Sequence, residues 1–165
     1  PRLMFGAKGI CGAYHCVICV ELDGKFLQFR TVDYLSCPKE HKHVDVVLQI
    51  LGSLNYSVRL AKFGWDPRDG EIVAYADLWL MDNDLTYNQF ARMLDNFLPV
   101  VDVNYRRISQ AIETGKDPGE LDPKKMLEEM LSEAGGMPGP LKKVLDRLRG
   151  GGHDDDDDDE GPAAI

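Results

Sequence analysis

The sequence is poor in cysteine, has no excess of basic residues and contains no long apolar run, and each shortage excludes a class of protein. Four cysteines among 165 residues are too few for a disulfide scaffold. No stretch approaches the roughly 18 consecutive apolar residues of a membrane span. Lys and Arg number 19 against 28 Asp and Glu, and no basic stripe with aromatics marks a nucleic-acid site. We therefore predict no membrane or nucleic-acid partner.

The N-terminal residues show no apolar run followed by a small-residue cleavage site, so we expect a cytoplasmic protein. The net charge of −9 comes mostly from the acidic run "DDDDDDE" at residues 154–160, and the rest of the chain is nearly neutral. Like charges repel one another and bury nothing, so we expect residues 151–165 to form a disordered tail.

Catalytic signatures are also missing. The chain has neither a glycine-rich nucleotide loop nor a nucleophile elbow, so we predict no enzyme and no cofactor. A Cys/His set could bind zinc or provide a reactive thiol, and its candidates are Cys16, Cys37, His41 and His43. Cys16 and Cys19 lie three apart on a predicted strand, so their side chains should point to opposite faces. A small zinc- or thiol-dependent protein therefore remains only an alternative hypothesis.

Periodicity predicts two β-hairpins and two main helices. Strands at 13–22 and 25–32 flank a two-residue "DG" turn, and strands at 56–65 and 71–80 flank "DPRDG". A helix is predicted at about 43–55, and a longer one follows the capping-box pair Thr86 and Gln89, with Pro99 expected to kink or divide it. The predicted fold is α+β, a small twisted antiparallel sheet with helices mainly on one face.

These elements suggest four regions along the chain. Residues 1–12 form a lead-in, 13–115 the α+β domain, 116–150 two short amphipathic helices, and 151–165 the acidic tail. Helices of about three turns are marginal alone, so the two short helices would pack on the domain or on a partner.

The segment "EIVAYADLWL" at residues 71–80 carries apolar side chains on both faces. At period two, one face holds Ile72, Ala74 and Ala76, and the other holds aromatic residues. A strand covered on one side normally alternates apolar with polar residues, so the second face needs a further cover. We predict an aromatic patch that either contacts a partner or lies beneath another part of the chain. Its candidates are Val73, Tyr75 and Trp79, with Phe63 and Trp65 from the neighbouring strand.

The middle of the chain resembles the YbjN-like family of bacterial sensory transduction regulators. The resemblance covers residues 23–112 and rests on "LGSLNYSVRLAKFGWDPRDGEI" and on "LTYNQFARMLDNF" followed by "VVDVNY". It implies a type III secretion chaperone-like fold, often dimeric, that binds another polypeptide and has no catalytic residues. Family members usually have a helix, with or without another strand, before the first hairpin, and residues 1–12 leave little room for these elements.

Both lines of reasoning favour a noncatalytic protein-binding module, chaperone-like or adaptor-like and regulatory in role. Its partner would be a protein or peptide client, bound through the aromatic sheet face or through a strand edge, whose unpaired amides accept an extended segment. Homodimer formation is compatible with this hypothesis. A structural subunit of a larger complex is the second alternative.

Overall fold

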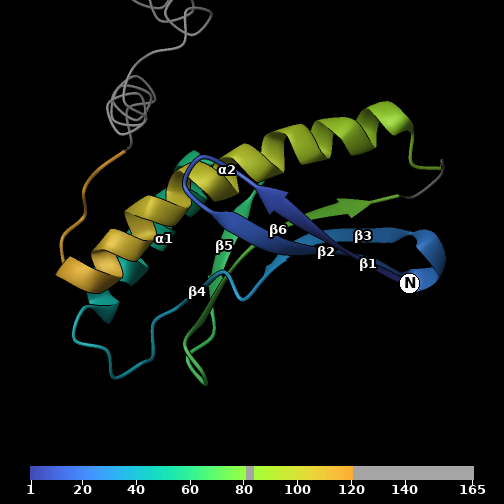
Figure 1. Cartoon of the computed structure of the whole chain (residues 1–165). Coiled ribbons are helices and arrows are strands. Elements are labelled where there is room, and N and C mark those ends of the chain that lie inside the picture. Colours follow the sequence, from blue (N-terminus) through green and yellow to red (C-terminus); the bar gives the residue numbers. More distant parts are fainter. Residues whose placement is uncertain (81–83, 121–165) are drawn as a thin grey trace, which may run out of the picture. The chain divides into compact units, whose positions relative to one another are not determined.

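The computed structural model describes residues 1–80 and 84–120, which form one antiparallel sheet and two helices (Figure 1). Strands β1, β2, β3 and β6 lie side by side in that order. β3 and the short β4 pair with one edge of β6, and β5 pairs with its opposite edge. A short 3-10 turn, Leu22–Gly24, connects β2 to β3. The elements are β1 (Arg2–Lys8), β2 (Ala13–Glu21), β3 (Phe26–Val32), β4 (Leu35–Ser36), α1 (Val44–Ser57), β5 (Lys62–Trp65), β6 (Glu71–Trp79) and α2 (Tyr87–Thr114).

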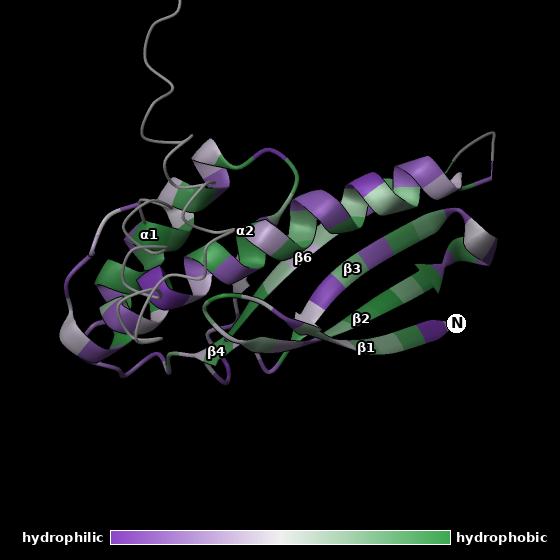
Figure 2. Cartoon of the chain, turned by 45° about the horizontal axis from the view of Figure 1, so that its top comes forward, coloured by the Kyte–Doolittle hydropathy of each residue, from purple (hydrophilic) through white to green (hydrophobic). Residues whose placement is uncertain are grey.

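Both helices pack on the same side of the sheet, as Figures 1 and 2 show. The core between the layers is aromatic and aliphatic: Phe29 on β3 contacts Phe90 and Phe97 on α2, with ring centroids 5.6 and 6.2 Å apart. The buried side chains of β6, Ile72 and Ala74, belong to the same core. The structure therefore confirms the predicted α+β class with helices on one face.

The two ends of the long helix α2 are set by capping residues in the local sequence. Thr86 and Gln89 form the predicted capping box, and Gly115 ends the helix in a left-handed conformation with φ of 72°. Pro99 lies inside α2, which continues past it, so the predicted division of the helix does not occur. Within residues 1–80 and 84–120, no helix has the length and apolarity needed to cross a membrane.

The first predicted hairpin forms, but its turn is longer than the predicted two residues. Glu21 pairs with Phe26, so four residues connect β2 and β3. Leu22, Asp23 and Gly24 all have positive φ, and the 3-10 turn that they form replaces the expected tight "DG" turn. The second hairpin turns at residues 66–70 as predicted, with Gly70 at φ of 77°.

Residues 2–8 form a strand, so the prediction of a lead-in at 1–12 is wrong. β1 pairs with β2 along its whole length, from Arg2 opposite Cys19 to Lys8 opposite Ala13. An edge strand gains its backbone hydrogen bonds from its neighbour, and its own apolar pattern can therefore be weak. The predicted short helices and acidic tail lie beyond Glu120, outside the described residues.

A buried carboxylate attaches the β1–β2 turn to α2. Asp102 accepts hydrogen bonds from the amides of Ile10 and Cys11, at 2.6 and 2.9 Å, and from the Tyr14 hydroxyl at 2.7 Å. Burial, assisted by the bond to Asp102, raises the pKa of Tyr14 above its ordinary value. A Cβ on Gly9 would overlap the Asp102 carboxylate, so this close approach requires glycine.

Candidate functional site

The sheet surface opposite the helices, here called the outer face, is the candidate site. Side chains alternate along β6: Ile72, Ala74 and Ala76 are buried against the helices, whereas Val73 and Tyr75 on the outer face are half-buried. No helix covers this surface in the part of the chain that the structure describes. The outer face comprises Val17, Cys19, Phe26, Gln28, Arg30, Val73, Tyr75, Asp77 and Trp79.

An aromatic pair lies at one end of the outer face. Phe26 on β3 is the register partner of Trp79 on β6, and their ring centroids are 5.0 Å apart with planes inclined by 57°. The Trp79 side chain remains 59% exposed despite this contact. Phe26 was absent from the predicted patch, because only the strand pairing places it beside Trp79.

The centre of the outer face carries paired charges beside apolar surface. Arg30 donates to Glu71 at 2.8 Å, and Gln28 donates to Asp77 at 2.9 Å. The second half of β2 is coloured as hydrophobic in Figure 2. Residues 16–20 are all apolar, so this part of the strand places apolar side chains on both faces of the sheet. The outer face is therefore amphipathic. The charges of Arg30 and Glu71 neutralise each other, whereas Asp77 is hydrogen-bonded to a neutral amide and keeps its negative charge.

A shallow hollow of about 460 Å³ lies next to this centre. Gly64 forms part of it, and a Cβ there would reach contact distance from Tyr75 and Val73, at 3.4 Å. The absence of a side chain at this position leaves space at the surface. The hollow is lined by Arg30, Gly64, Trp65, Asp66, Pro67, Arg68, Glu71 and Val73.

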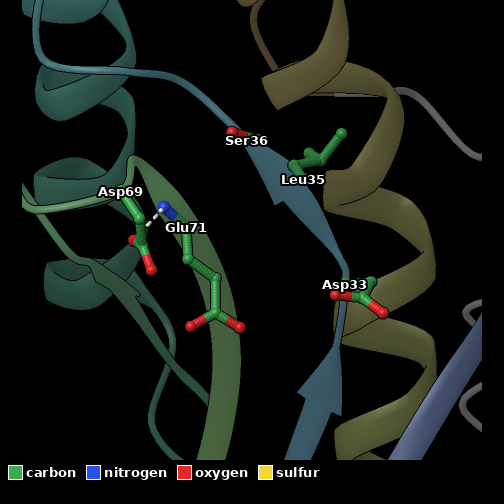
Figure 3. A pocket seen from close by; sticks show the side chains of 5 residues that line it. All are labelled: Asp33, Leu35, Ser36, Asp69 and Glu71. Carbon is green, nitrogen blue, oxygen red and sulfur yellow. Dashed lines mark hydrogen bonds between the residues drawn. The ribbon is translucent and has the colours of Figure 1, made fainter.

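A second hollow, of about 500 Å³, is acidic and is shown in Figure 3. Asp69 accepts a hydrogen bond from the Glu71 amide at 2.9 Å, which is a turn-stabilising contact. The lining residues are Asp33, Leu35, Ser36, Asp69 and Glu71. In residues 1–80 and 84–120, no three His, Cys, Asp or Glu side chains come together as a metal site would require.

Two residues of the predicted patch lie elsewhere. Phe63 is 3% exposed and belongs to the core, where its ring contacts Tyr34, so the prediction that it joins the outer face is wrong. Its register partner is Ala74, which faces the helices, and directly opposed residues share a face. Trp65 likewise pairs with Ile72, but it sits at the strand end, lines the shallow hollow and donates from Nε1 to the Cys37 carbonyl at 2.8 Å.

The Cys/His set does not assemble into one site, although His41 and His43 lie together with ring centroids 5.4 Å apart. Cys16 and Cys37 are buried in the core, and His43 Nδ1 lies 2.9 Å from the Ile112 carbonyl oxygen. Cys16 faces the helices and Cys19 the opposite side, which confirms their predicted divergence. Burial raises the pKa of the Cys16 thiol to about 11 and also raises that of Cys37. Raised thiol pKa values disfavour the thiolate that nucleophilic chemistry needs.

A comparison with known protein families identifies the family of this chain. Residues 5–110 match the model of the family YbjN, described as "Putative bacterial sensory transduction regulator". The chain belongs to the YbjN family. The matched residues run from the middle of β1 through most of α2, so the whole sheet except the first three residues of β1 lies within the family domain.

One solved structure resembles this YbjN domain. It is described as "Structure of the HopA1-SchA Chaperone-Effector Complex", and the match has a TM-score of 0.38 and 14% sequence identity. The match covers 53% of this chain and 64% of that one, so the chain spans less than two thirds of its neighbour's length. No curated protein sequence matches this chain.

Proposed function

We propose that this YbjN protein is a noncatalytic protein-binding module, adaptor-like or chaperone-like, that binds another polypeptide through its outer face. The observation that carries the proposal is the Phe26–Trp79 pair, in which Trp79 is exposed and Phe26 is half-buried. Exposed clusters of large apolar side chains mark contact sites, and tryptophan and tyrosine are enriched among residues that dominate interface energies.

The charges of the outer face indicate what kind of partner surface would fit. Arg30 pairs with Glu71, and Arg68 pairs with Asp66 at 2.5 Å, so the hollow between them presents no uncompensated charge. A partner would place an apolar or aromatic side chain in the hollow and polar groups around it, as at ordinary protein interfaces. The burial of the Cys16, Cys19 and Cys37 thiols supports a noncatalytic role.

The proposal is tested by capture of partners from native cell extract with the tagged full-length chain. Trp79→Ala and Tyr75→Ala are each compared with the unsubstituted protein and with Tyr56→Ala. Tyr56 is the matched control because it lies on α1, away from the outer face, and is 95% exposed. Thermal unfolding of every variant shows whether the fold is kept.

We expect Trp79→Ala and Tyr75→Ala to stay folded and to lose a partner that Tyr56→Ala retains. The same partner should then be tested with purified components, where loss of an aromatic residue that dominates the interface weakens binding by about tenfold or more. Equal capture by all folded variants would reject the outer face as the binding surface.

The predicted dimer is a separate proposal. Sedimentation of the purified chain over a range of concentrations measures it directly, and a concentration-independent monomer mass would contradict it.

A further inference from the structure

The outermost strand, β1, exposes a row of unpaired backbone groups. The Val20 amide donates to the Pro1 carbonyl and the Gly9 amide to the Gly12 carbonyl, so the odd-numbered residues of this strand bond to β2. Hydrogen-bonded and non-bonded pairs alternate in an antiparallel ladder. The amides and carbonyls on the outward side therefore belong to Arg2, Met4, Gly6 and Lys8. In the described part of the chain, no further strand pairs with them.

The same strand exposes apolar side chains on both faces of the sheet. Leu3 is 60% and Met4 67% exposed, and Ile10 at the adjacent turn is also exposed. An added strand would cover Leu3 on the helix side and Met4 on the outer side. Free backbone groups and exposed apolar side chains thus coincide at one edge.

At the edge formed by β5, a side chain occupies outward backbone groups. The Asn55 side chain on α1 accepts from the Phe63 amide at 2.8 Å and donates to the Phe63 carbonyl at 2.9 Å. These two bonds replace those that another strand would make. β1 has no comparable side-chain cap among the hydrogen bonds of the described residues.

The charged residues at the two ends of β1 indicate which kind of segment would pair with it. Arg2 and Lys8 stand at the two ends of the strand, and the residues between them carry no charge. A second copy paired in full antiparallel overlap would place Arg2 opposite Lys8, and like charges directly opposed are destabilising. A segment with acidic residues at its two ends would instead pair with both cations.

We propose that β1 binds an extended client segment with two acidic ends and an alternating apolar centre, which adds to the sheet as a seventh strand. A segment of seven residues matches the length of β1. The inference rests on the proposed protein-binding function but uses a different surface from the Phe26–Trp79 pair. Each surface can therefore fail its test while the other passes.

The probe is a fluorescein-labelled peptide of seven residues, with alternating valine and threonine between two terminal aspartates, titrated with the full-length chain. A second peptide carries lysine at both ends. A third keeps the aspartates but is N-methylated at the two positions that would face Met4 and Gly6, which removes two of the backbone donors that would bond to β1. We expect the second and third peptides to bind about tenfold or more weakly, and binding of the first to weaken as salt screens the charges.

Variants of the chain test the same contact from the other side. Met4→Pro removes one outward amide without removing a bond to β2, and edge positions tolerate proline. Met4→Ala is its control, because it removes the side chain and keeps the amide. Arg2→Glu combined with Lys8→Glu should reverse the preference between the aspartate and lysine peptides, and Trp79→Ala should leave peptide binding unchanged.

Several outcomes would overturn the proposal. Equal binding of the aspartate and N-methylated peptides would exclude strand addition, and equal binding by folded Met4→Pro and Met4→Ala would do the same. Chain dimers that are lost in Met4→Pro and are not displaced by the aspartate peptide would assign the edge to a second copy. If the aspartate peptide does not bind but Trp79→Ala still loses its captured partner, β1 is excluded and the outer face remains the proposed binding site.

Discussion

Phe26 and Trp79 are paired across β3 and β6, with ring centroids 5.0 Å apart, on the side of the sheet that the helices leave uncovered. The pair unites residues from two hairpins that are distant in sequence. Because the pair lies on the surface, removing it should lower the free energy of unfolding less than removing a buried aromatic residue does.

Trp79→Ala should lower the free energy of unfolding by about 1 kcal/mol, since an exposed aromatic pair contributes roughly 0.5–1.5 kcal/mol. Phe97→Ala should cost about 3–5 kcal/mol, because Phe97 is fully buried between α2 and the sheet. Urea denaturation of both variants gives the comparison. A cost for Trp79→Ala as large as that for Phe97→Ala would place Trp79 energetically in the core.

Gly9→Ala should destabilise the protein by about 1–3 kcal/mol, because the new methyl group overlaps the Asp102 carboxylate. In an Asp102→Ala background the overlap disappears, so the same substitution should cost at least about 1 kcal/mol less. A double-mutant cycle from urea denaturation measures this coupling. Strictly additive costs would show that the turn does not depend on the approach of Gly9 to Asp102.

Acid should weaken the ion pair between Arg107 and Asp117. Arg107 donates from Nε and Nη2 at 2.8 and 2.7 Å, and these bonds hold the pKa of Asp117 below its ordinary value. The pair therefore stabilises the fold above the unfolded pKa of about 3.9, and this contribution is lost as pH falls through the lower folded pKa.

The measurement is urea denaturation of the unsubstituted protein and of Asp117→Asn, at pH 7 and at successively lower pH. The difference in stability between the two proteins should be largest at pH 7 and should shrink as Asp117 becomes protonated. A difference that stays constant down to pH 2 would mean that the carboxylate charge contributes nothing.

The cysteines should react in the order of their exposure. Cys11 is partly exposed, whereas Cys16, Cys19 and Cys37 are buried. Burial raises the pKa of the Cys11, Cys16 and Cys37 thiols alike, so exposure decides the order. With a thiol reagent at pH 8, we expect Cys11 to react first and the others only after denaturant is added. Rapid reaction of Cys16 or Cys37 in the folded protein would instead favour the alternative thiol-dependent function.

Much of the fold could be predicted because its signals are local. The capping box at Thr86 and Gln89 satisfies backbone donors within one turn, so three or four residues are enough to locate the start of α2. The turn at residues 66–70 likewise depends on its own proline and glycine. Alternation along residues 71–79 also separated Val73, Tyr75 and Trp79 from the core side of the strand.

The errors concern residues whose environment depends on another strand. Phe63 lies on a four-residue strand, and a shift of one position would move it from one face to the other. Only its pairing with Ala74 shows that it points into the core. β1 was not predicted for a similar reason. Its backbone is held by pairing with β2 and by the turn that is hydrogen-bonded to Asp102, and both are contacts with residues outside the strand itself.

The amino-acid sequence by itself determined the helices, the two internal hairpins and the presence of apolar side chains on both faces of β6, because each follows from spacing within a short segment. Tertiary structure alone decided that Phe26 meets Trp79, that Phe63 is internal and that β1 forms an open edge. These relationships require a register between strands, and register is set by contacts among residues that are far apart along the chain.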